Sequence, residues 1–291
     1  MRVSNIKDNK ISKFTEFQGI NDGFEDTTKE LWEKGLSEPK WWFIIEKDGE
    51  ILGRVGYWSS KDNKKNIRIF GLLLKWERED VLKIGKKLLN YSLQRMKDNG
   101  AENINYQVHS DDTNNIELVK KILEAVGLQN IQQKKSFYLK SDIYHKDKRN
   151  DLTYKSLNEV GKDKFISIIK KVTRKTLDKE DELSVKKSGE EEHAINHYNT
   201  LKSIEYAPKN WFLGYRENEI IGLVIPQKFN NELGAINYIG VIPKERGKNY
   251  VSDLLNKGII SLFNRGVDRI VADIDVNNLP MEDALLDANF K

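Results

Sequence analysis

The stretch "VIPKERGKNYVSDLL", Val241 to Leu255, follows the apolar run "AINYIG" and leads into apolar residues at helical spacing. Three basic residues, Lys244, Arg246 and Lys248, surround one glycine between the predicted strand and the predicted helix. The start of a helix presents unpaired N–H groups and the positive end of the helix dipole, which suits a pyrophosphate. This strand–loop–helix order predicts a phosphate-binding loop. The alternative is a solvated loop that holds no ligand.

Two parts of the chain repeat the same pattern. The segments "WFIIEKDGEILGRVGYW" and "WFLGYRENEIIGLVIPQ" each read as a β-hairpin, with Gly53 and Gly222 at the same place in the second strand. Further on, the helical pattern after Lys86 matches the one after Ser252, and both end at a glycine, Gly100 and Gly266. The repeat has the size of a domain, so it predicts two tandem domains of one fold, residues 1–145 and 152–291. They are joined near the charged segment "KSDIYHKDKRND", residues 140–151.

The second half gives the order of elements in one unit. Helices are expected over residues 158–177 and 189–204, then a hairpin turning at residues 217–219 and a strand over residues 232–242. After the basic loop come a helix over residues 250–264, a strand over residues 269–276 and a short helix over residues 280–288. A strand–helix–strand crossover makes its two strands parallel, whereas the hairpin is antiparallel. The fold class is therefore α/β (α+β mixed sheet), with a central mixed β-sheet flanked by helices in each unit.

The basic loop and its surroundings resemble the acetyl-coenzyme A loop of the GNAT superfamily of N-acetyltransferases. The family pattern is Val-x-Pro-x-x-Arg-Gly-x-Gly-x-Gly/Ala before a Leu-Leu helix, and the matching residues here are Val241, Pro243, Arg246, Gly247, Leu254 and Leu255. The resemblance implies acetyl-CoA as cosubstrate. The residues expected to bind it are Ile239, Val241, Arg246, Gly247, Lys248, Asn249, Tyr250 and Val251.

Two positions depart from the family's glycines. Asn249 replaces one of them, and because Asn tolerates positive φ better than most residues, we expect it to keep the turn. Val251 replaces another, and its β-branched side chain restricts close approach of the ligand. Cofactor binding is therefore expected to be weakened or shifted.

The first half keeps the fold pattern but not the loop. Asp80 and Val81 stand where the second half has Arg246 and Gly247, and Glu77 and Glu79 add negative charge. Like charges repel a pyrophosphate. We expect a degenerate GNAT-like domain that has no working phosphate loop.

The resemblance implies transfer of an acetyl group to a primary amine, with a carboxylate or water chain as base. A backbone N–H near Ile239 to Val241 would stabilise the oxyanion. The tyrosine that protonates the leaving thiolate in many relatives falls on Leu285 here, and on Leu123 in the first half, so that acid is missing. The catalytic candidates are Tyr250, Asp273 and Glu205, with Tyr238, Tyr206 and Asp275 as further alternatives.

The whole chain restricts the other classes of function. Its 49 basic and 45 acidic residues nearly balance, and no clustered basic face predicts nucleic-acid binding. There is no cysteine and no apolar run of membrane-spanning length, so a cytoplasmic protein without a membrane partner is expected. His193 and His197 have the spacing of a metal pair on a helix, but no third ligand is evident. No metal is predicted, and a solvated helix face is favoured.

The second half ends soon after Phe290, whereas the first half continues into the strand-like "KSFYLK". We therefore expect the second sheet to lack its final strands and to expose an edge, which invites strand exchange or a homodimer. The function predicted is an acetyl-CoA-dependent N-acetyltransferase acting on an unidentified small primary amine. The alternative is a non-catalytic acyl-CoA-binding or protein-interaction module with a decayed active site.

Overall fold

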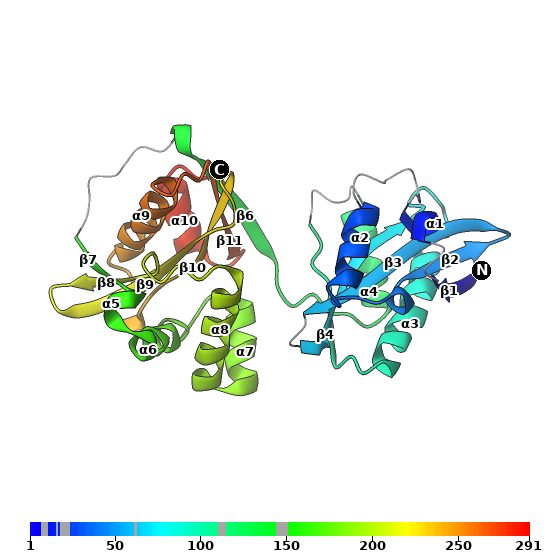
Figure 1. Cartoon of the computed structure of the whole chain (residues 1–291), viewed down its shortest axis with the longest axis horizontal. Coiled ribbons are helices and arrows are strands. Elements are labelled where there is room, and N and C mark those ends of the chain that lie inside the picture. The colour runs from blue at the N-terminus through cyan, green and yellow to red at the C-terminus, as the bar shows by residue number, and fades with distance from the viewer. Residues whose placement is uncertain (7–10, 16, 18–23, 61–62, 110–114, 144–150) are drawn as a thin grey trace. The chain divides into compact units, whose positions relative to one another are not determined.

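The computed structural model describes residues 1–6, 11–15, 17, 24–60, 63–109, 115–143 and 151–291 (Figure 1). The chain forms two compact units, Met1–Asn130 and Ile131–Lys291. The linker predicted over residues 140–151 lies largely outside the described residues.

The first unit contains a five-stranded sheet in the order β1-β2-β3-β4-β5. Its strands are β1 (Arg2–Asn5), β2 (Phe43–Lys47), β3 (Glu50–Ser60), β4 (Asn63–Leu74) and β5 (Asn103–Asn105). Only the pair β4 and β5 is parallel. The helices are α1 (Ile11–Thr15), α2 (Phe24–Glu33), α3 (Val81–Asp98) and α4 (Ile116–Ala125), with a 3-10 turn over Pro39–Trp41. Trp42 is fully buried among the rings of Phe14, Phe24, Trp32 and Phe70.

The second unit contains a six-stranded sheet in the order β6-β11-β10-β9-β8-β7. Its strands are β6 (Lys134–Lys140), β7 (Thr153–Ser156), β8 (Phe212–Arg216), β9 (Glu219–Lys228), β10 (Leu233–Val241) and β11 (Arg269–Asp275). Its helices are α5 (Leu157–Val160), α6 (Lys162–Val172), α7 (Lys179–Ser188), α8 (Glu190–Ile204), α9 (Tyr250–Phe263) and α10 (Leu279–Asp287), with 3-10 turns over Ser141–Ile143 and Pro243–Glu245. The predicted β8–β9 hairpin and the parallel β10–α9–β11 crossover are confirmed. The strand β7 and the helix α7 were not predicted from the sequence.

Apolar clusters cover both faces of the second sheet. Leu254, Ile259 and Leu285 from α9 and α10 pack on one face, and Phe165, Ile169 and Tyr198 from α6 and α8 pack on the other. The mixed sheet flanked by helices in each unit is the predicted fold class. None of the helices that the structure describes is both long and apolar enough to cross a bilayer.

The glycine repeated in both hairpins has a packing role. A Cβ on Gly222 would collide with the backbone oxygen of Gly240 on the neighbouring strand, and a Cβ on Gly53 would collide with the side chain of Leu74. The strands therefore approach each other more closely at these points than any side chain would permit. The repeat thus reflects a shared fold rather than a shared ligand contact.

The strand β6 shifts the boundary between the two units and covers the sheet edge that was predicted to be exposed. All seven residues of β6 pair antiparallel with β11, from Lys134 opposite Asp275 to Lys140 opposite Arg269. The compact units accordingly divide at Asn130, upstream of the expected end at residue 145, because β6 belongs to the second sheet. Residues 152–291 alone do end their sheet at β11, as expected, but the same chain covers this edge. The exposed β11 edge that suggested a homodimer is therefore absent.

Candidate functional site

The strands β10 and β11 separate part of the way along the second sheet. They pair only from Leu233 opposite Arg269 to Ala235 opposite Val271, while β10 continues to Val241 and β11 to Asp275. A bulge between Ile236 and Tyr238 marks the same point on the β9 side of β10. Bulges bend a strand and end its pairing. The result is a gap that opens between two parallel strands, next to the loop that follows β10.

Backbone groups of β10 face this gap. The N–H of Ile242 donates to Ile221 O of β9 over 2.9 Å. Because backbone groups of successive residues point to opposite sides of a strand, the N–H and C=O groups of the odd-numbered residues next to it in β10 point away from β9. The carbonyl of Val241 accordingly accepts from Arg246 rather than from β9. By the same alternation, the N–H groups of Ile239 and Val241 point into the gap.

The loop between β10 and α9 contains two residues with positive φ. Gly247 has φ +76° and Asn249 has φ +63°, so the prediction that Asn249 keeps the turn is confirmed. In the part of the chain that the structure describes, the backbone N–H groups of Gly247, Lys248, Asn249, Tyr250 and Val251 donate to no hydrogen-bond acceptor. Five consecutive free donors therefore lie at the positive end of α9.

Arg246 does not offer its guanidinium to a ligand. Its Nε donates to Val241 O (3.0 Å), and Nη2 donates to Val172 O (2.8 Å) and Arg174 O (3.0 Å). Nη1 donates to Lys175 O over 2.7 Å. The side chain thus ties the loop to the C-terminal end of α6. Arg246 therefore has a structural role at this position, because it holds the loop in place.

The other loop cations are paired at the surface. Lys248 lies 2.8 Å from Glu245, and Lys244 lies 3.2 Å from Glu219. Both lysine side chains are more than half exposed, and pairs of this kind contribute little to stability. They remain free to turn toward an anion.

Tyr250 and Val251 turn their side chains toward the core below the loop. Tyr250 is the first residue of α9; its ring is buried in the apolar cluster under the helix, and its hydroxyl accepts a hydrogen bond from Arg216 at the end of β8. This hydroxyl is therefore engaged by a side chain of β8, two strands from β10 in the sheet. Val251 packs on the same apolar cluster, so its side chain does not occupy the mouth of the loop.

The two carboxylate candidates lie at different ends of the sheet. Glu205 follows α8 and accepts from Lys228 N over 2.8 Å, and its carboxylate also pairs with Arg265. Lys228 lies beside Gly234 at the start of β10, roughly 23 Å along the strand from the loop. Asp273 is exposed on β11, beyond the last residue that pairs with β10. Only Asp273 is therefore near the gap.

The position of the family's tyrosine is filled by an apolar residue. Leu285 is fully buried in the α9–α10 cluster. Tyr206, another alternative, is about half exposed and packs edge-on against Trp211. Neither supplies a proton donor at the gap.

The equivalent loop of the first unit has a different backbone. Asp80 stands at the N-cap position of α3 with φ −92° and makes no side-chain capping bond; its carboxylate accepts from Arg78 over 2.8 Å. Gly85, which matches Val251, packs under Ile122 and Leu74, where a Cβ would come within 2.9 Å of both side chains. An acidic group thus sits where the second unit presents free N–H groups.

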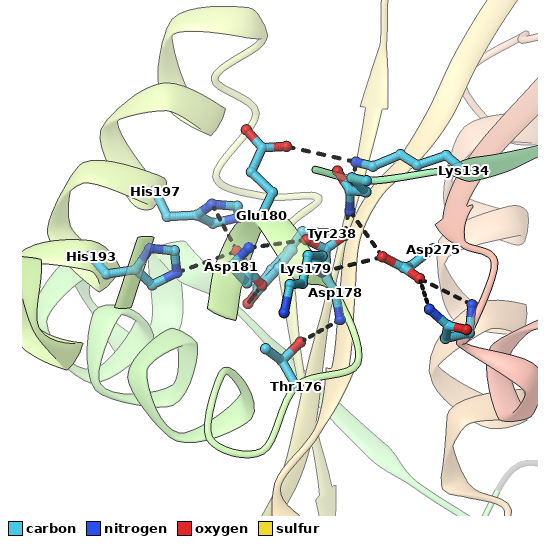
Figure 2. A network of polar contacts seen from close by, with 12 residues as sticks. Lys134, Thr176, Asp178, Lys179, Glu180, Asp181, His193, His197, Tyr238 and Asp275 are labelled. Atoms are coloured by element: carbon cyan, nitrogen blue, oxygen red, sulfur yellow. Dashed lines mark hydrogen bonds and ion pairs between the residues drawn. The ribbon is translucent and has the colours of Figure 1, made fainter. Parts of the chain in front are cut away.

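A polar network lies on the α6–α8 side of the second sheet (Figure 2). Asp275 ends β11, and its Oδ1 accepts from Asn277 N (3.0 Å), so it caps a turn. Its Oδ2 accepts from Lys179 N at the start of α7 over 3.3 Å. The hydroxyl of Tyr238 donates to Asp181 Oδ2 over 3.4 Å. These contacts hold α7 against β10 and β11.

The two histidines of α8 belong to this network. His193 is 3% exposed and His197 is half-buried, and both rings point toward Asp181 (Figure 2). The expected solvated helix face is therefore wrong, because α7 covers it. The i,i+4 spacing was visible in the sequence, but Asp181 comes from another helix and could not be identified from spacing.

Burial and charge act together on these groups. Burial alone would raise the pKa of Asp181, but the contact with His193 and the charges of both histidines lower it below its usual value. Burial lowers the pKa of His197, and burial with the charge of Asp181 raises the pKa of Tyr238. At neutral pH Asp181 is thus a carboxylate, and Tyr238 keeps its proton.

Comparison with known proteins supports the same fold. The acetyltransferase (GNAT) family model matches residues 11–124 and 176–285. A GCN5-related N-acetyltransferase from Sphaerobacter thermophilus is similar in structure, with a TM-score of 0.66 at 14% identity over 100% of this chain and 91% of that one. A tandem GNAT protein from the clavulanic acid biosynthesis pathway, solved without acetyl-CoA, has a TM-score of 0.54 at 10% identity over 100% and 94%.

A GCN5-related glucosamine N-acetyltransferase region of a fungal multi-domain GH3 β-N-acetylglucosaminidase is also similar. Its TM-score is 0.61 at 13% identity, over 100% of this chain and 37% of that one. No curated protein matches the sequence. The family model covers most of the chain in two segments, one in each unit, and the chain therefore belongs to the acetyltransferase (GNAT) family.

Proposed function

We propose that the protein is an acetyl-CoA-dependent N-acetyltransferase whose active site lies in the second unit and whose acceptor is a small primary amine. The observation that carries this proposal is the run of five unpaired backbone N–H groups from Gly247 to Val251, beside the gap between β10 and β11. An anionic pyrophosphate is suited to such a helix N-terminus. Beyond Ala235 the backbone of β10 is no longer paired with β11 and offers further polar groups beside these donors.

The residues present fit the cosubstrate. Gly247 and Asn249 hold the loop open, the side chain of Val251 packs away from it, and Arg246 fixes the loop to α6. Ile239 and Val241 would hold the pantetheine arm and the thioester carbonyl through their backbone N–H groups. When bound, acetyl-CoA supplies an activated acetyl thioester.

Asp273 is the group we propose as general base. It is exposed on β11, past the point where β10 departs, and faces away from the buried side chains of Ala272 and Ile274. Its face of the sheet is the one that carries Tyr238. There it can accept the proton that the amine must lose. Glu205 and Tyr250 do not fit this role, because both are engaged away from the gap.

The leaving group finds no acid at Leu285. A general acid contributes about 100- to 10,000-fold to a rate, so turnover is expected to be slow for an enzyme of this kind. A thiol of pKa about 8.5 can leave as a thiolate without a general acid, so acetyl transfer remains possible. Slow turnover is consistent with the proposed activity.

The test is thiol release from acetyl-CoA by the full chain in the presence of a panel of primary amines. Asp273→Asn should lower kcat about 100-fold or more and leave acetyl-CoA binding unchanged. Asp268→Asn removes an exposed carboxylate at the other end of β11 and should have no effect. Equal rates in the two variants would contradict the role of Asp273.

The alternative is an acyl-CoA-binding module without catalysis, which Leu285 favours. Binding of acetyl-CoA without turnover on any amine of the panel would support it. Absence of both binding and turnover would contradict both functions.

A further inference from the structure

A second cluster of chemically active side chains lies outside the proposed acetyl-CoA site. Asp181 on α7 faces His193 and His197 on α8, and one donor atom from each lies within 4.8 Å of the others. The histidines are four residues apart, so both project from the same face of α8. Figure 2 shows both rings directed at the carboxylate.

Hydrogen bonding does not account for this cluster. Among the contacts of the described residues, the buried Nε2 of His193 makes no well-formed hydrogen bond and meets Asp181 Oδ1 only over a long 3.3 Å. Asp181 forms no ion pair with a described lysine or arginine; the ionisable side chains next to it are the two histidines. Buried polar atoms are nearly always satisfied, and an unsatisfied one is costly. A buried imidazole nitrogen that faces a carboxylate without a well-formed hydrogen bond indicates a missing partner.

The distances suit an ion at the centre of the cluster. Asp181 Oδ1 lies 3.3 Å from His193 Nε2 and 3.9 Å from His197 Nδ1. Ligands at about 2.0–2.2 Å in tetrahedral array lie roughly 3.3–3.6 Å from each other. The donors are thus too far apart for good hydrogen bonds and close to the spacing of metal ligands.

The packing of α7 is a second, independent indication that a group is missing from this cluster. Of the ten residues of α7, only Asp181 is buried. A helix usually binds its neighbours through an apolar stripe, but here the buried contact is a carboxylate. The carboxylate of Asp181 is thus the buried side chain through which α7 meets α8 and β10.

We propose that Asp181, His193 and His197 bind one divalent transition-metal ion, with Zn²⁺ as the preferred ion. Two imidazoles and a carboxylate are ligands that zinc accepts, and they disfavour Mg²⁺ and Ca²⁺, which prefer oxygen alone. A water or the hydroxyl of Tyr238, 3.4 Å from Asp181 Oδ2, completes the coordination. The ion anchors α7 to α8 and to β10 next to the proposed acyl site.

The test uses the full chain, without an affinity tag and treated with a chelator. Zn²⁺ is titrated calorimetrically, and Co²⁺ is added separately because tetrahedral Co²⁺ absorbs visibly. We expect one ion per chain, a visible Co²⁺ spectrum, and no binding of Mg²⁺. Zn²⁺ at 100 times its Kd should raise the unfolding temperature by on the order of 5 °C.

Two variants and a control locate the site. Asp181→Asn and His197→Gln keep the size of the side chain and should weaken Zn²⁺ binding by at least about 100-fold. His109→Gln changes a histidine of the first unit and should bind as the wild type does. Absence of stoichiometric Zn²⁺ and Co²⁺ binding in the wild type would overturn the proposal. So would equal Zn²⁺ affinity in the wild type and both variants.

Discussion

Arg246 provides a test of how the proposed acetyl-CoA loop is held. Its guanidinium donates to four carbonyls, and two of these bonds, to Val241 O and Val172 O, are partly buried. A hydrogen bond contributes about 0.5–1.5 kcal/mol net, and water replaces the two exposed bonds at little cost. Arg246→Met should therefore destabilise the second unit by about 2 kcal/mol. For a unit of this size that lowers the unfolding temperature by about 4–8 °C.

The same change should weaken acetyl-CoA binding through the order of the loop. If one loop residue becomes disordered, binding must fix it again at about 1–2 kcal/mol. Because 1.4 kcal/mol is a factor of ten, Kd should rise about tenfold. Calorimetric titration with acetyl-CoA and thermal unfolding of the same samples measure both effects.

Arg246→Lys separates position from charge. Lysine keeps the charge but has one nitrogen, which cannot reach four carbonyls, so this variant should lose nearly as much stability and affinity as Arg246→Met. Lys248→Met removes a loop cation that is paired at the surface and should change stability little. If Arg246→Lys binds acetyl-CoA as the wild type does and Arg246→Met binds weakly without loss of stability, the arginine acts by charge and our account is wrong.

Three other outcomes follow from the structure. A chain starting at Ile131 should fold, whereas a chain starting at Leu152 lacks β6, exposes the edge of β11 and should aggregate. Gel filtration and circular dichroism measure both outcomes. A soluble, folded chain starting at Leu152 would contradict the role of β6. Asn249→Gly should keep the acetyl-CoA affinity of the wild type. Asn249→Val should lower the free energy of unfolding by about 1–2 kcal/mol, because a β-branched residue resists φ +63°. Equal stability of Asn249→Val and the wild type in urea unfolding would refute this. Burial raises the pKa of Tyr57, so stability that is present below pH 10 should fall as the pH rises above it, where tyrosines of the unfolded chain ionise. Tyr57→Phe should flatten that fall in alkaline unfolding curves.

Local patterns predicted much of the second unit. The hairpin, the parallel crossover and the turn at Asn249 follow from alternation, helical spacing and the tolerance of asparagine for positive φ. These features depend on neighbours in the sequence. They could therefore be predicted without information on contacts between distant parts of the chain.

The missed features depend on distant partners. The helix α7 has no apolar stripe, and its one buried side chain is Asp181, so periodicity gave no signal. The strand β6 follows the first unit in the sequence, but it pairs with β11, more than 120 residues away. Arg246 was visible as a loop cation, but not the carbonyls that it binds. Side-chain direction and long-range pairing explain these three differences.

Calorimetric titration of the full chain with acetyl-CoA tests the central claim most directly, with two glycine variants as a pair. Gly247 and Gly266 lie just before and after α9, have φ +76° and +72°, and have no neighbour within 4 Å of an added Cβ. Gly247→Ala and Gly266→Ala therefore carry a similar backbone cost of about 1–2 kcal/mol. We predict one acetyl-CoA per chain, bound at least about tenfold more weakly by Gly247→Ala and nearly unchanged by Gly266→Ala. Absence of binding, or equal affinity in both variants, would contradict an acetyl-CoA site at the start of α9.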